Sequence, residues 1–388
     1  MKKILLIGIV LIILFVGGFF FWIETHTNKS NSSTNKEQIT NRIQDEDVKN
    51  SIFKDYYKEA TKVVSKMTLE EKVGQLFLVR YDKNEISTWN EYNPGGYLLF
   101  AKDFENHNKE SIKKEIDNNQ KNSKYPLIIG VDEEGGYVTR VSRFPAFREE
   151  KFSSPKYYYE TGGYELLEKI EKEKAELLKS IGINYNLAPV ADISTDENDF
   201  IYSRSFGHNK EETQVFIKNM VTYANKYHIA SCLKHFPGYG NNQDTHTGIA
   251  IDNRSYENFL ENDFLPFKAG IEANVPTILV SHNIVTAIDN QYPSSLSSKV
   301  IKELRNTLSF TGIVITDDLA MDAVKSYVEN GEAATLAILA GNDMIITSDF
   351  LSMYQEVLDS VKNNKISEDI INKAVLRIIA WKYQQKLF

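Results

Sequence analysis

The sequence predicts a single (β/α)8 barrel, the TIM-barrel architecture, behind an N-terminal transmembrane helix. Eight short apolar runs recur along the 388 residues with helical stretches between them, and polar residues directly follow five of these runs. One further apolar segment, at the N-terminus, is much longer than the rest. Strands that alternate with helices indicate a parallel sheet, and eight is the number of strands that closes such a barrel.

The N-terminal segment is long enough to span a bilayer. Residues 4–23 are apolar and uncharged, and Lys2 and Lys3 precede them. At about 1.5 Å per residue, a helix of this length crosses a hydrocarbon core of about 30 Å. The lysines predict a single-pass anchor in the cell membrane, with residues after 23 on the extracytoplasmic side. The alternative is the cleaved signal of a secreted protein, but no small-x-small cleavage site follows Ile23.

The rest of the chain divides into a tether and one folded domain. Residues 24–50 are rich in Asn, Ser, Thr, Lys and Glu, which is typical of a disordered linker. Residues 51–388 contain no second linker, so we expect one large barrel rather than two smaller domains.

The net charge of −8 gives no reason to expect a nucleic-acid partner. Cys232 is the only cysteine, which excludes an intrachain disulfide.

The first predicted element of the domain is a helix. Thr68 and Glu71 have the spacing of a capping box, which opens a helix ahead of the first strand. Amphipathic stretches at 164–180 and 212–227 indicate helices between later strands. No glycine-rich phosphate-binding motif follows any apolar run, which argues against a doubly wound sheet. The eight predicted strands are 75–79, 96–100, 127–131, 184–188, 230–233, 277–280, 312–315 and 344–347.

Five of the predicted strands end in charged or hydrogen-bonding side chains. In a barrel of this kind the C-terminal ends of the strands meet at one face, where catalytic groups lie. One such end would be an ordinary solvated loop, but five together predict a shared polar pocket. The ends are Asp132-Glu133-Glu134, Lys234-His235, Ser281-His282, Asp317-Asp318 and Ser348-Asp349.

The most specific string in the chain is Lys-His-Phe-Pro-Gly-Tyr-Gly at residues 234–240. Its proline and two glycines predict a tight turn just after a strand, which would hold Lys234 and His235 at the barrel mouth. Two other interpretations are open at this point. The string could be a glycine-rich connection that carries a cation by chance, or its lysine could form a Schiff base.

Two further groups are candidates for proton transfer and nucleophilic attack. Asp244 and His246 are two residues apart, so in an extended backbone their side chains share a face and the carboxylate could orient the imidazole. Asp317 lies directly at the end of a strand, whereas Asp318 fits the N-cap of a following helix. Glycoside hydrolysis needs a carboxylate nucleophile and a separate proton donor.

Five motifs, in this order, resemble glycoside hydrolase family 3 and, more narrowly, its single-domain β-N-acetylglucosaminidase branch. They cover the predicted barrel: residues 67–75, residues 130–136, the 234–240 string, Asp244-x-His246 and residues 315–321. The resemblance implies a retaining exo-β-N-acetylglucosaminidase, a β-N-acetylhexosaminidase that releases terminal β-linked GlcNAc from glycans such as cell-wall fragments. It implies no metal and no organic cofactor.

The resemblance also implies a role for each site residue. Asp317 aligns with the catalytic nucleophile, and His246, polarised by Asp244, aligns with the acid/base. Two residues depart from the branch: Tyr137 and Tyr239 stand where Arg and His are frequent, so we expect a different pocket shape. The positions that bind sugar hydroxyls are Asp132, Arg140, Arg204, Lys234 and His235.

Four alternatives use the same residues. The β-glucosidases of the family share the Lys-His-Phe string but generally take their acid from an additional C-terminal domain. Because the sequence ends at Phe388, we expect no such domain here. A phosphorylase would use phosphate in place of water. An inactive glycan-binding barrel would lack the nucleophile or the Asp-x-His pair. A metal-dependent barrel hydrolase would take its ligands from His235, His246, His282 and Asp317.

Overall fold

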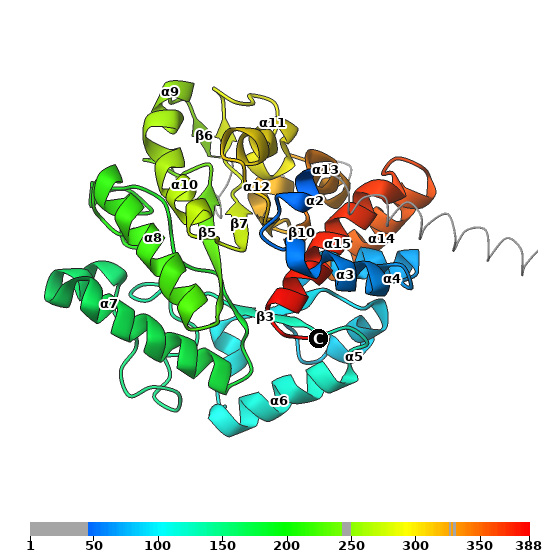
Figure 1. Cartoon of the computed structure of the whole chain (residues 1–388), viewed down its shortest axis with the longest axis horizontal. Coiled ribbons are helices and arrows are strands. Elements are labelled where there is room, and N and C mark those ends of the chain that lie inside the picture. Colours follow the sequence, from blue (N-terminus) through cyan, green and yellow to red (C-terminus); the bar gives the residue numbers. More distant parts are fainter. Residues whose placement is uncertain (1–45, 243–249, 326, 329–330) are drawn as a thin grey trace, which may run out of the picture.

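The computed structural model describes residues 46–242, 250–325, 327–328 and 331–388. These residues form a barrel of parallel strands with helices around it (Figure 1). The barrel is closed, with the strand order β1-β10-β9-β7-β5-β4-β3-β2, and β1 pairs with β10 to complete the ring. A separate two-stranded sheet pairs β6 (Ile251–Asp252) with β8 (Ile284–Val285). The predicted (β/α)8 barrel is therefore confirmed.

All eight predicted strands are present, and each begins within two residues of its predicted start. Gln75, predicted in the first strand, instead ends a helix. Two strands are longer than predicted, so the polar residues Lys234, His235, Asp317 and Asp318 belong to strands and not to the turns that follow them. The barrel strands are β1 (Phe77–Arg80), β2 (Gly96–Leu99), β3 (Ile128–Val131), β4 (Tyr185–Asn186), β5 (Ala230–Phe236), β7 (Thr277–Val280), β9 (Ile313–Asp318) and β10 (Met344–Thr347).

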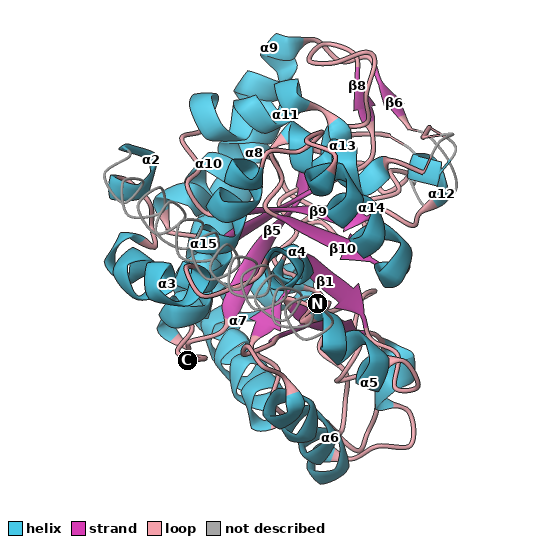
Figure 2. Cartoon of the chain, turned by 90° about the vertical axis from the view of Figure 1, so that its right-hand side faces the viewer, coloured by secondary structure: helices cyan, strands magenta, loops and turns pink. Residues whose placement is uncertain are grey.

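Helices surround the barrel on its outside (Figure 2). The helix predicted at 164–180 is the second part of α7, which begins earlier and has non-helical backbone angles at Gly162 and Gly163. The α-helices are α2 (Glu46–Lys49), α3 (Tyr57–Val64), α4 (Leu69–Gln75), α5 (Ile86–Trp89), α6 (Lys109–Asn122), α7 (Pro155–Ser180), α8 (Lys210–Lys226), α9 (Tyr256–Asn258), α10 (Phe264–Glu272), α11 (Ser298–Lys302), α12 (Asp322–Lys325), α13 (Ala333–Ala340), α14 (Phe350–Lys362) and α15 (Glu368–Gln384). Short 3-10 or π-helical turns are η1 (Lys54–Tyr56), η2 (Asn90–Tyr92), η3 (Ala101–Phe104), η4 (Phe259–Asp263), η5 (Ser294–Leu296) and η6 (Glu303–Thr307).

The start of α4 shows how local sequence sets a helix boundary. The Thr68 hydroxyl accepts a hydrogen bond from the Glu71 backbone N at 3.2 Å, and the Glu71 carboxylate accepts one from the Thr68 backbone N at 3.1 Å. Two of the N–H groups that a helix leaves unpaired at its start are thereby satisfied. The predicted capping box is confirmed.

The N-terminal ends of the strands are closed by helix α15. Its Trp381 is fully buried, and the indole ring packs edge-on against Tyr185 of β4 with the ring centres 5.2 Å apart. Helices α3 and α4, near the start of the described chain, lie beside α15 (Figure 1). The open end of the barrel is therefore the opposite one, where the strands end.

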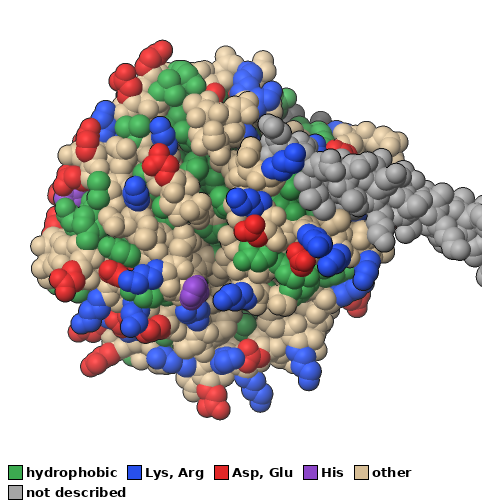
Figure 3. All heavy atoms as spheres, viewed as in Figure 1, with side chains coloured by type: hydrophobic (Ala, Val, Ile, Leu, Met, Phe, Trp, Pro, Cys, Tyr) green, Lys and Arg blue, Asp and Glu red, His purple; other side chains and the backbone are tan. Residues whose placement is uncertain are grey.

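The N-terminal predictions fall mostly on residues that are not described. The predicted anchor at residues 4–23 lies outside the described residues, as does the tether up to residue 45. Within the described residues, no helix is both long and apolar enough to cross a bilayer. The end of the predicted tether forms α2, and Val48 packs against the core, so the folded domain begins slightly earlier than expected. On the face seen in Figure 3, described side chains of both charge signs are interspersed.

Candidate active site

A cavity of about 710 Å³ opens at the C-terminal ends of the strands. Strands from all around the barrel contribute to its wall, from Arg80 of β1 to Ile346 of β10. The shared polar pocket predicted from the strand ends is therefore present. Six of the residues singled out in the sequence line this one cavity: Asp132, Arg140, Arg204, Lys234, His235 and Asp317.

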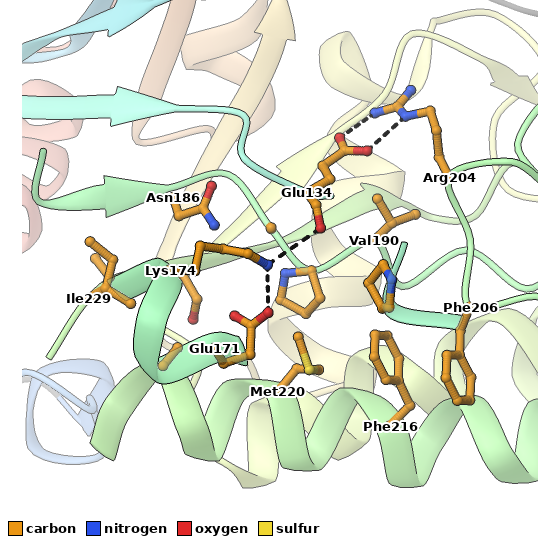
Figure 4. A pocket seen from close by; sticks show the side chains of 16 residues that line it. Glu134, Glu171, Lys174, Asn186, Val190, Arg204, Phe206, Phe216, Met220 and Ile229 are labelled. Atoms are coloured by element: carbon orange, nitrogen blue, oxygen red, sulfur yellow. Dashed lines mark hydrogen bonds and ion pairs between the residues drawn. The ribbon is translucent and has the colours of Figure 1, made fainter. Parts of the chain in front are cut away.

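Two carboxylates and two cations form a network in the cavity wall. The Lys234 ammonium lies 2.6 Å from the Asp132 carboxylate and 2.6 Å from that of Glu134. Glu134 also accepts a two-pronged pair of hydrogen bonds from the Arg204 guanidinium, at 3.1 and 2.7 Å (Figure 4). Such charge-assisted pairs are strong and fix the orientation of both side chains. Each cation of the network therefore has at least one carboxylate as a partner.

The network keeps Glu134 and Lys234 charged although both are buried. Burial alone would raise the pKa of the Glu134 carboxyl, but the charges of Arg204 and Lys234 hold that pKa well below its ordinary value. Burial would likewise lower the pKa of the Lys234 ammonium, and Asp132 and Glu134 raise it above the ordinary value instead. Lys234 therefore stays protonated, which argues against the Schiff-base interpretation, since that chemistry needs a neutral amine.

The loop after β3 is folded around the buried Glu133 carboxylate. This side chain accepts hydrogen bonds from the backbone N of Arg140 at 2.8 Å and of Val141 at 2.7 Å. The Ser142 hydroxyl donates to it as well. The carboxylate thus places Arg140 at the cavity, where its guanidinium lies 3.9 Å from the Asp132 carboxylate. Glu133 organises the loop and does not line the cavity.

His235 is held in one orientation from two sides. Its Nδ1 and its backbone N both bond to the Asp192 carboxylate, at 2.8 and 3.0 Å. Its Nε2 lies 3.1 Å from Nη2 of Arg204, and a guanidinium can only donate. The hydrogen-bond pattern therefore assigns the ring proton to Nδ1 and the lone pair to Nε2. Asp192 also accepts from the backbone N of Tyr239 at 2.8 Å, which fixes the turn after β5.

The two neighbouring residues at the end of β9 both line the cavity, but their carboxylates make different hydrogen bonds. The Oδ1 of Asp317 accepts from the backbone N of Asp318 at 2.8 Å. Asp318 accepts from the backbone N of Ala320 and of Ser348, at 2.9 and 3.1 Å. Helix α12 begins only at Asp322, so the predicted N-cap role of Asp318 is wrong: this carboxylate fastens the β9 and β10 loops together instead.

Asp244 and His246 lie outside the described residues, although the chain on both sides of them is described. His282 does not line the cavity: its Nδ1 lies 2.8 Å from the Ser295 hydroxyl and its Nε2 lies 3.0 Å from the Asp318 carbonyl oxygen. Among the residues that the structure describes, no three His, Cys, Asp or Glu side chains are grouped so that they could hold a metal ion.

A small cavity of about 20 Å³ lies behind the network, between the barrel wall and helices α7 and α8. Figure 4 shows Lys174 of α7 reaching into it between the Glu171 carboxylate, at 2.5 Å, and the Glu134 carbonyl oxygen, at 3.5 Å. Helix α7 therefore supports the backbone from which Glu134 points into the active-site cavity.

Two residues of the site were not among the candidates from the sequence. Asp192 orients His235, and Arg80 lines the cavity from β1 with its guanidinium over the Phe100 ring. Arg80 follows the rule that polar residues at strand ends face the site, and applying that rule to every strand would have found it, as it found Glu134. Asp192 lies beyond the end of β4, so its role depends on the turn that the structure shows.

A parallel barrel whose open end gathers carboxylates, cations and an imidazole around one cavity is typical of an enzyme of the (β/α)8 class. The particular family follows from comparison with known proteins. The chain belongs to glycosyl hydrolase family 3, because the model of that family's N-terminal domain matches residues 68–381. The protein is a glycoside hydrolase.

Proteins with similar sequences or structures support this family assignment. A beta-hexosaminidase of Nitrosomonas eutropha is 30% identical over 277 residues, which are 69% of this chain and 77% of the relative. A second, from Actinobacillus pleuropneumoniae, is 31% identical over 284 residues, with the same shares. A family 3 β-N-acetylglucosaminidase from Paenibacillus sp. superposes with a TM-score of 0.76 at 26% identity, covering 83% of this chain and 63% of that one. A β-N-acetylhexosaminidase from Beutenbergia cavernae shares the fold, with a TM-score of 0.73 at 24% identity over 82% and 99% of the chains.

Proposed function

We propose that this glycoside hydrolase is a retaining exo-β-N-acetylglucosaminidase. One observation carries the proposal: Asp317 shares its cavity with a pre-arranged set of hydrogen-bonding groups that suits a sugar. In addition, the Nε atoms of Arg80 and Arg140 are buried and have no hydrogen-bond partner among the described residues. Buried donors of this kind are costly unless a ligand oxygen satisfies them. The name of the similar β-N-acetylglucosaminidase from Paenibacillus sp. supports GlcNAc as the sugar that is released.

The reaction proceeds in two steps. The Asp317 carboxylate attacks the anomeric carbon, the bond from that carbon to the leaving oxygen breaks, and the His246 imidazolium gives its proton to this oxygen. Water then attacks the same carbon, gives a proton to neutral His246, and releases Asp317. Two inversions at one carbon retain the configuration. Asp132, Arg140, Arg204, Lys234 and His235 hold the hydroxyls of the sugar.

Turnover of aryl β-glycosides tests this function. We expect the aryl β-N-acetylglucosaminide to be hydrolysed about 10²-fold faster than the aryl β-glucoside, because the cavity is expected to contact the acetamido group. EDTA is expected to have no effect, and the first product seen by NMR is expected to be β-GlcNAc, with or without inorganic phosphate. Equal activity on the glucoside would assign the chain to the β-glucosidase branch. A sugar phosphate product would make it a phosphorylase.

We also propose that residues 4–23 anchor the enzyme in the cell membrane, with the barrel on the extracytoplasmic side. This place gives it access to cell-wall fragments that end in β-linked GlcNAc. We expect the full-length protein to fractionate with membranes and to be degraded by protease added to intact cells. A soluble mature form whose N-terminus lies beyond Ile23 would show a cleaved signal instead.

A further inference from the structure

Tyr137 is an exposed aromatic residue at the rim of the active-site cavity. Its side chain is 78% exposed, which is the highest value for any large hydrophobic residue that the structure describes. It is also one of the residues that line the cavity. A single exposed tyrosine elsewhere on a protein surface needs no explanation, but aromatic side chains that line a cavity commonly contact its ligand.

The turn that carries Tyr137 is held from both sides by backbone hydrogen bonds. The Gly135 backbone N donates to the Val138 carbonyl oxygen at 3.0 Å, and these two residues form an isolated antiparallel bridge. The Gly136 backbone N donates to the Phe152 carbonyl oxygen at 2.9 Å. Both glycines have positive φ, at +99° and +65°, which other residues rarely adopt. The backbone therefore presents the tyrosine at a fixed place.

The same turn packs closely against the segment that leads into helix α7. A Cβ atom on Gly135 would come within 2.5 Å of the Ser153 carbonyl oxygen, and one on Gly136 within 2.9 Å of the Ser154 Cβ. Ser154 is itself the N-cap of α7. A turn that is anchored in this way has little conformational freedom left to lose when a ligand binds, and this favours binding.

Tyr137 differs from the two phenylalanines that line the cavity. The Phe100 ring centre lies 4.3 Å from the Arg80 guanidinium carbon, and the Phe200 ring is tilted against Tyr239 with the ring centres 5.9 Å apart. Within the part of the chain that the structure describes, the Tyr137 side chain has no hydrogen bond, ring contact or cation contact. Its ring is therefore available to a ligand.

The charged network and Tyr137 lie at different depths of the cavity. The Lys234 and Glu134 side chains are 3% and 4% exposed, so they belong to its floor, whereas Tyr137 stands at its rim. The volume of about 710 Å³ is within the range of about 300–1,000 Å³ that is usual for ligand pockets. When a terminal sugar occupies the floor, the next sugar of the substrate lies towards the rim.

The two depths suit different surfaces of a sugar. Charged groups bind the hydroxyls at the edge of a pyranose ring, whereas the C–H groups on its faces form an apolar surface. Tyrosine offers a large flat ring and has only two side-chain torsions to fix, so stacking on it costs little entropy.

We propose that Tyr137 forms a second subsite, on which the sugar at the leaving-group side of the scissile bond stacks. This inference rests on the proposed function, in which Asp317 attacks the terminal sugar. It assigns a substrate class, namely glycans in which the terminal β-linked GlcNAc is attached to another pyranose. It also explains why the departure from the branch at this residue matters: it changes the preference for the leaving group.

Tyr157 provides a matched control. Its side chain is 55% exposed, in the first turn of α7, and it does not line the cavity. Its ring contacts only one other ring in the described residues, that of Tyr158, with the ring centres 5.7 Å apart. Tyr157→Ala therefore removes an exposed tyrosine from the same side of the molecule without changing the proposed subsite.

The experiment measures kcat/KM of the full-length protein on chitobiose and on methyl β-N-acetylglucosaminide. Both substrates release an alcohol and need a proton, so they differ mainly in whether a sugar ring stands on the leaving-group side. We expect Tyr137→Ala to lose about tenfold on chitobiose and to stay within about twofold on the methyl glycoside. Tyr157→Ala is expected to leave both values unchanged. Equal losses on the two substrates, or an unchanged chitobiose value in Tyr137→Ala, would overturn the second subsite.

A conservative variant tests the stacking itself. Tyr137→Phe keeps the ring and removes only an exposed hydroxyl, so we expect its kcat/KM on chitobiose to stay within about threefold of the original value. A Tyr137→Phe protein that loses as much as Tyr137→Ala would show that the hydroxyl binds the sugar, and would overturn the stacking. Because the side chain is exposed, neither variant is expected to change the melting temperature.

A binding measurement separates this inference from the proposed function. In the Asp317→Ala protein, calorimetry is expected to show that adding Tyr137→Ala weakens chitobiose binding about tenfold and leaves GlcNAc binding within about twofold. Hydrolysis of glucosides in place of GlcNAc glycosides would refute the proposed function, and cellobiose and methyl β-glucoside would then test the subsite. If GlcNAc glycosides are hydrolysed and Tyr137→Ala affects both of them equally, the function stands and the second subsite alone is refuted.

Discussion

The two ends of the barrel both contain buried charge networks, but only one of them is a site. At the C-terminal end, each cation faces a carboxylate and the group opens into a cavity of about 710 Å³. At the N-terminal end, Arg305 and Arg377 share one carboxylate, and helix α15 lies across the strand starts. The members of the first network are Asp132, Glu134, Arg204 and Lys234, and those of the second are Asp343, Arg305 and Arg377.

The N-terminal network binds backbone groups rather than a ligand. Asp343 pairs with Arg305 at 2.7 Å and with Arg377, and it accepts from the Val314 backbone N at 2.9 Å. Arg305 donates to the carbonyl oxygens that precede β9. These bonds align the starts of β9 and β10 with each other, which is a structural function.

Burial and a shifted pKa do not by themselves identify an active site. Burial lowers the pKa of Lys382 to about 7 and that of Arg305 to about 10, and both residues lie at the closed end. Perturbed groups are useful indicators only when they also face a cavity. In a (β/α)8 barrel, the end of the strand at which a charge lies separates the two cases.

The largest expected effect is the loss of Asp317 at the open end. Asp317→Ala removes the proposed nucleophile, so we expect kcat/KM to fall by about 10⁴-fold or more on every substrate, with little change in melting temperature. Asp343→Asn at the closed end is expected to lower the melting temperature and to change kcat/KM little. Steady-state kinetics and thermal unfolding of both variants check the pair. An Asp317→Ala protein that is unfolded or still active would contradict the assignment.

The proposed acid/base pair comes next. His246→Ala is expected to lower kcat/KM on disaccharides by about 10²–10⁴-fold, which is the usual range for general acid–base catalysis. Asp244→Ala is expected to lower it less, since it disturbs the imidazole without deleting it. With a dinitrophenyl leaving group, stopped-flow kinetics should show a burst followed by slow turnover. A slow first step with this leaving group would exclude His246 as the acid.

The barrel and much of the site were predictable because their signals are local. Apolar runs located all eight strands, and the rule for strand ends located Asp132, Lys234, His235 and Asp317. The resemblance to the family added Arg140 and Arg204, which lie in loops where periodicity gives no signal.

The pairings within the site were not predictable from sequence patterns. Glu134 and Arg204 are 70 residues apart, and Asp192 and His235 are 43 apart, so only the closed fold brings them together. Arg254 is a similar case, because it donates to Gly238 and Asp263, which are 16 and 9 residues away on other segments. Such contacts form only in the folded barrel, and the local sequence preferences for helix or strand do not indicate them.

A matched pair of arginines tests the comparison directly. Arg204→Ala leaves Glu134 without its two-pronged partner beside the sugar, so we expect a loss of about 10²-fold in kcat/KM for each folded molecule. Arg377→Ala is expected to lower the free energy of unfolding by about 2–4 kcal/mol and leave kcat/KM within about threefold of the original value. Chemical unfolding and kinetics on active-site-titrated protein separate the two. Similar catalytic losses in both variants would show that the closed end also governs the site.

The smallest expected effect concerns the fully buried Lys382, whose ammonium donates to Gln75 at 2.7 Å. Burial lowers its folded-state pKa to about 7, from an unfolded value of about 10.5. Between these values the unfolded chain binds more protons, so this residue makes the free energy of unfolding rise with pH. Below about pH 7 the full cost of burying the charge is present.

Lys382→Met removes that cost together with the Gln75 hydrogen bond, which is itself worth about 1 kcal/mol. We therefore expect the variant to be more stable than the original protein by about 2 kcal/mol at pH 6, and the difference to shrink steadily as the pH rises towards 10. Urea unfolding of both proteins at several pH values measures this difference. Activity should not change, because Lys382 lies at the closed end. A stability difference that does not vary with pH would mean that Lys382 is charged throughout, and that the closed end tolerates an ammonium as well as the open end does.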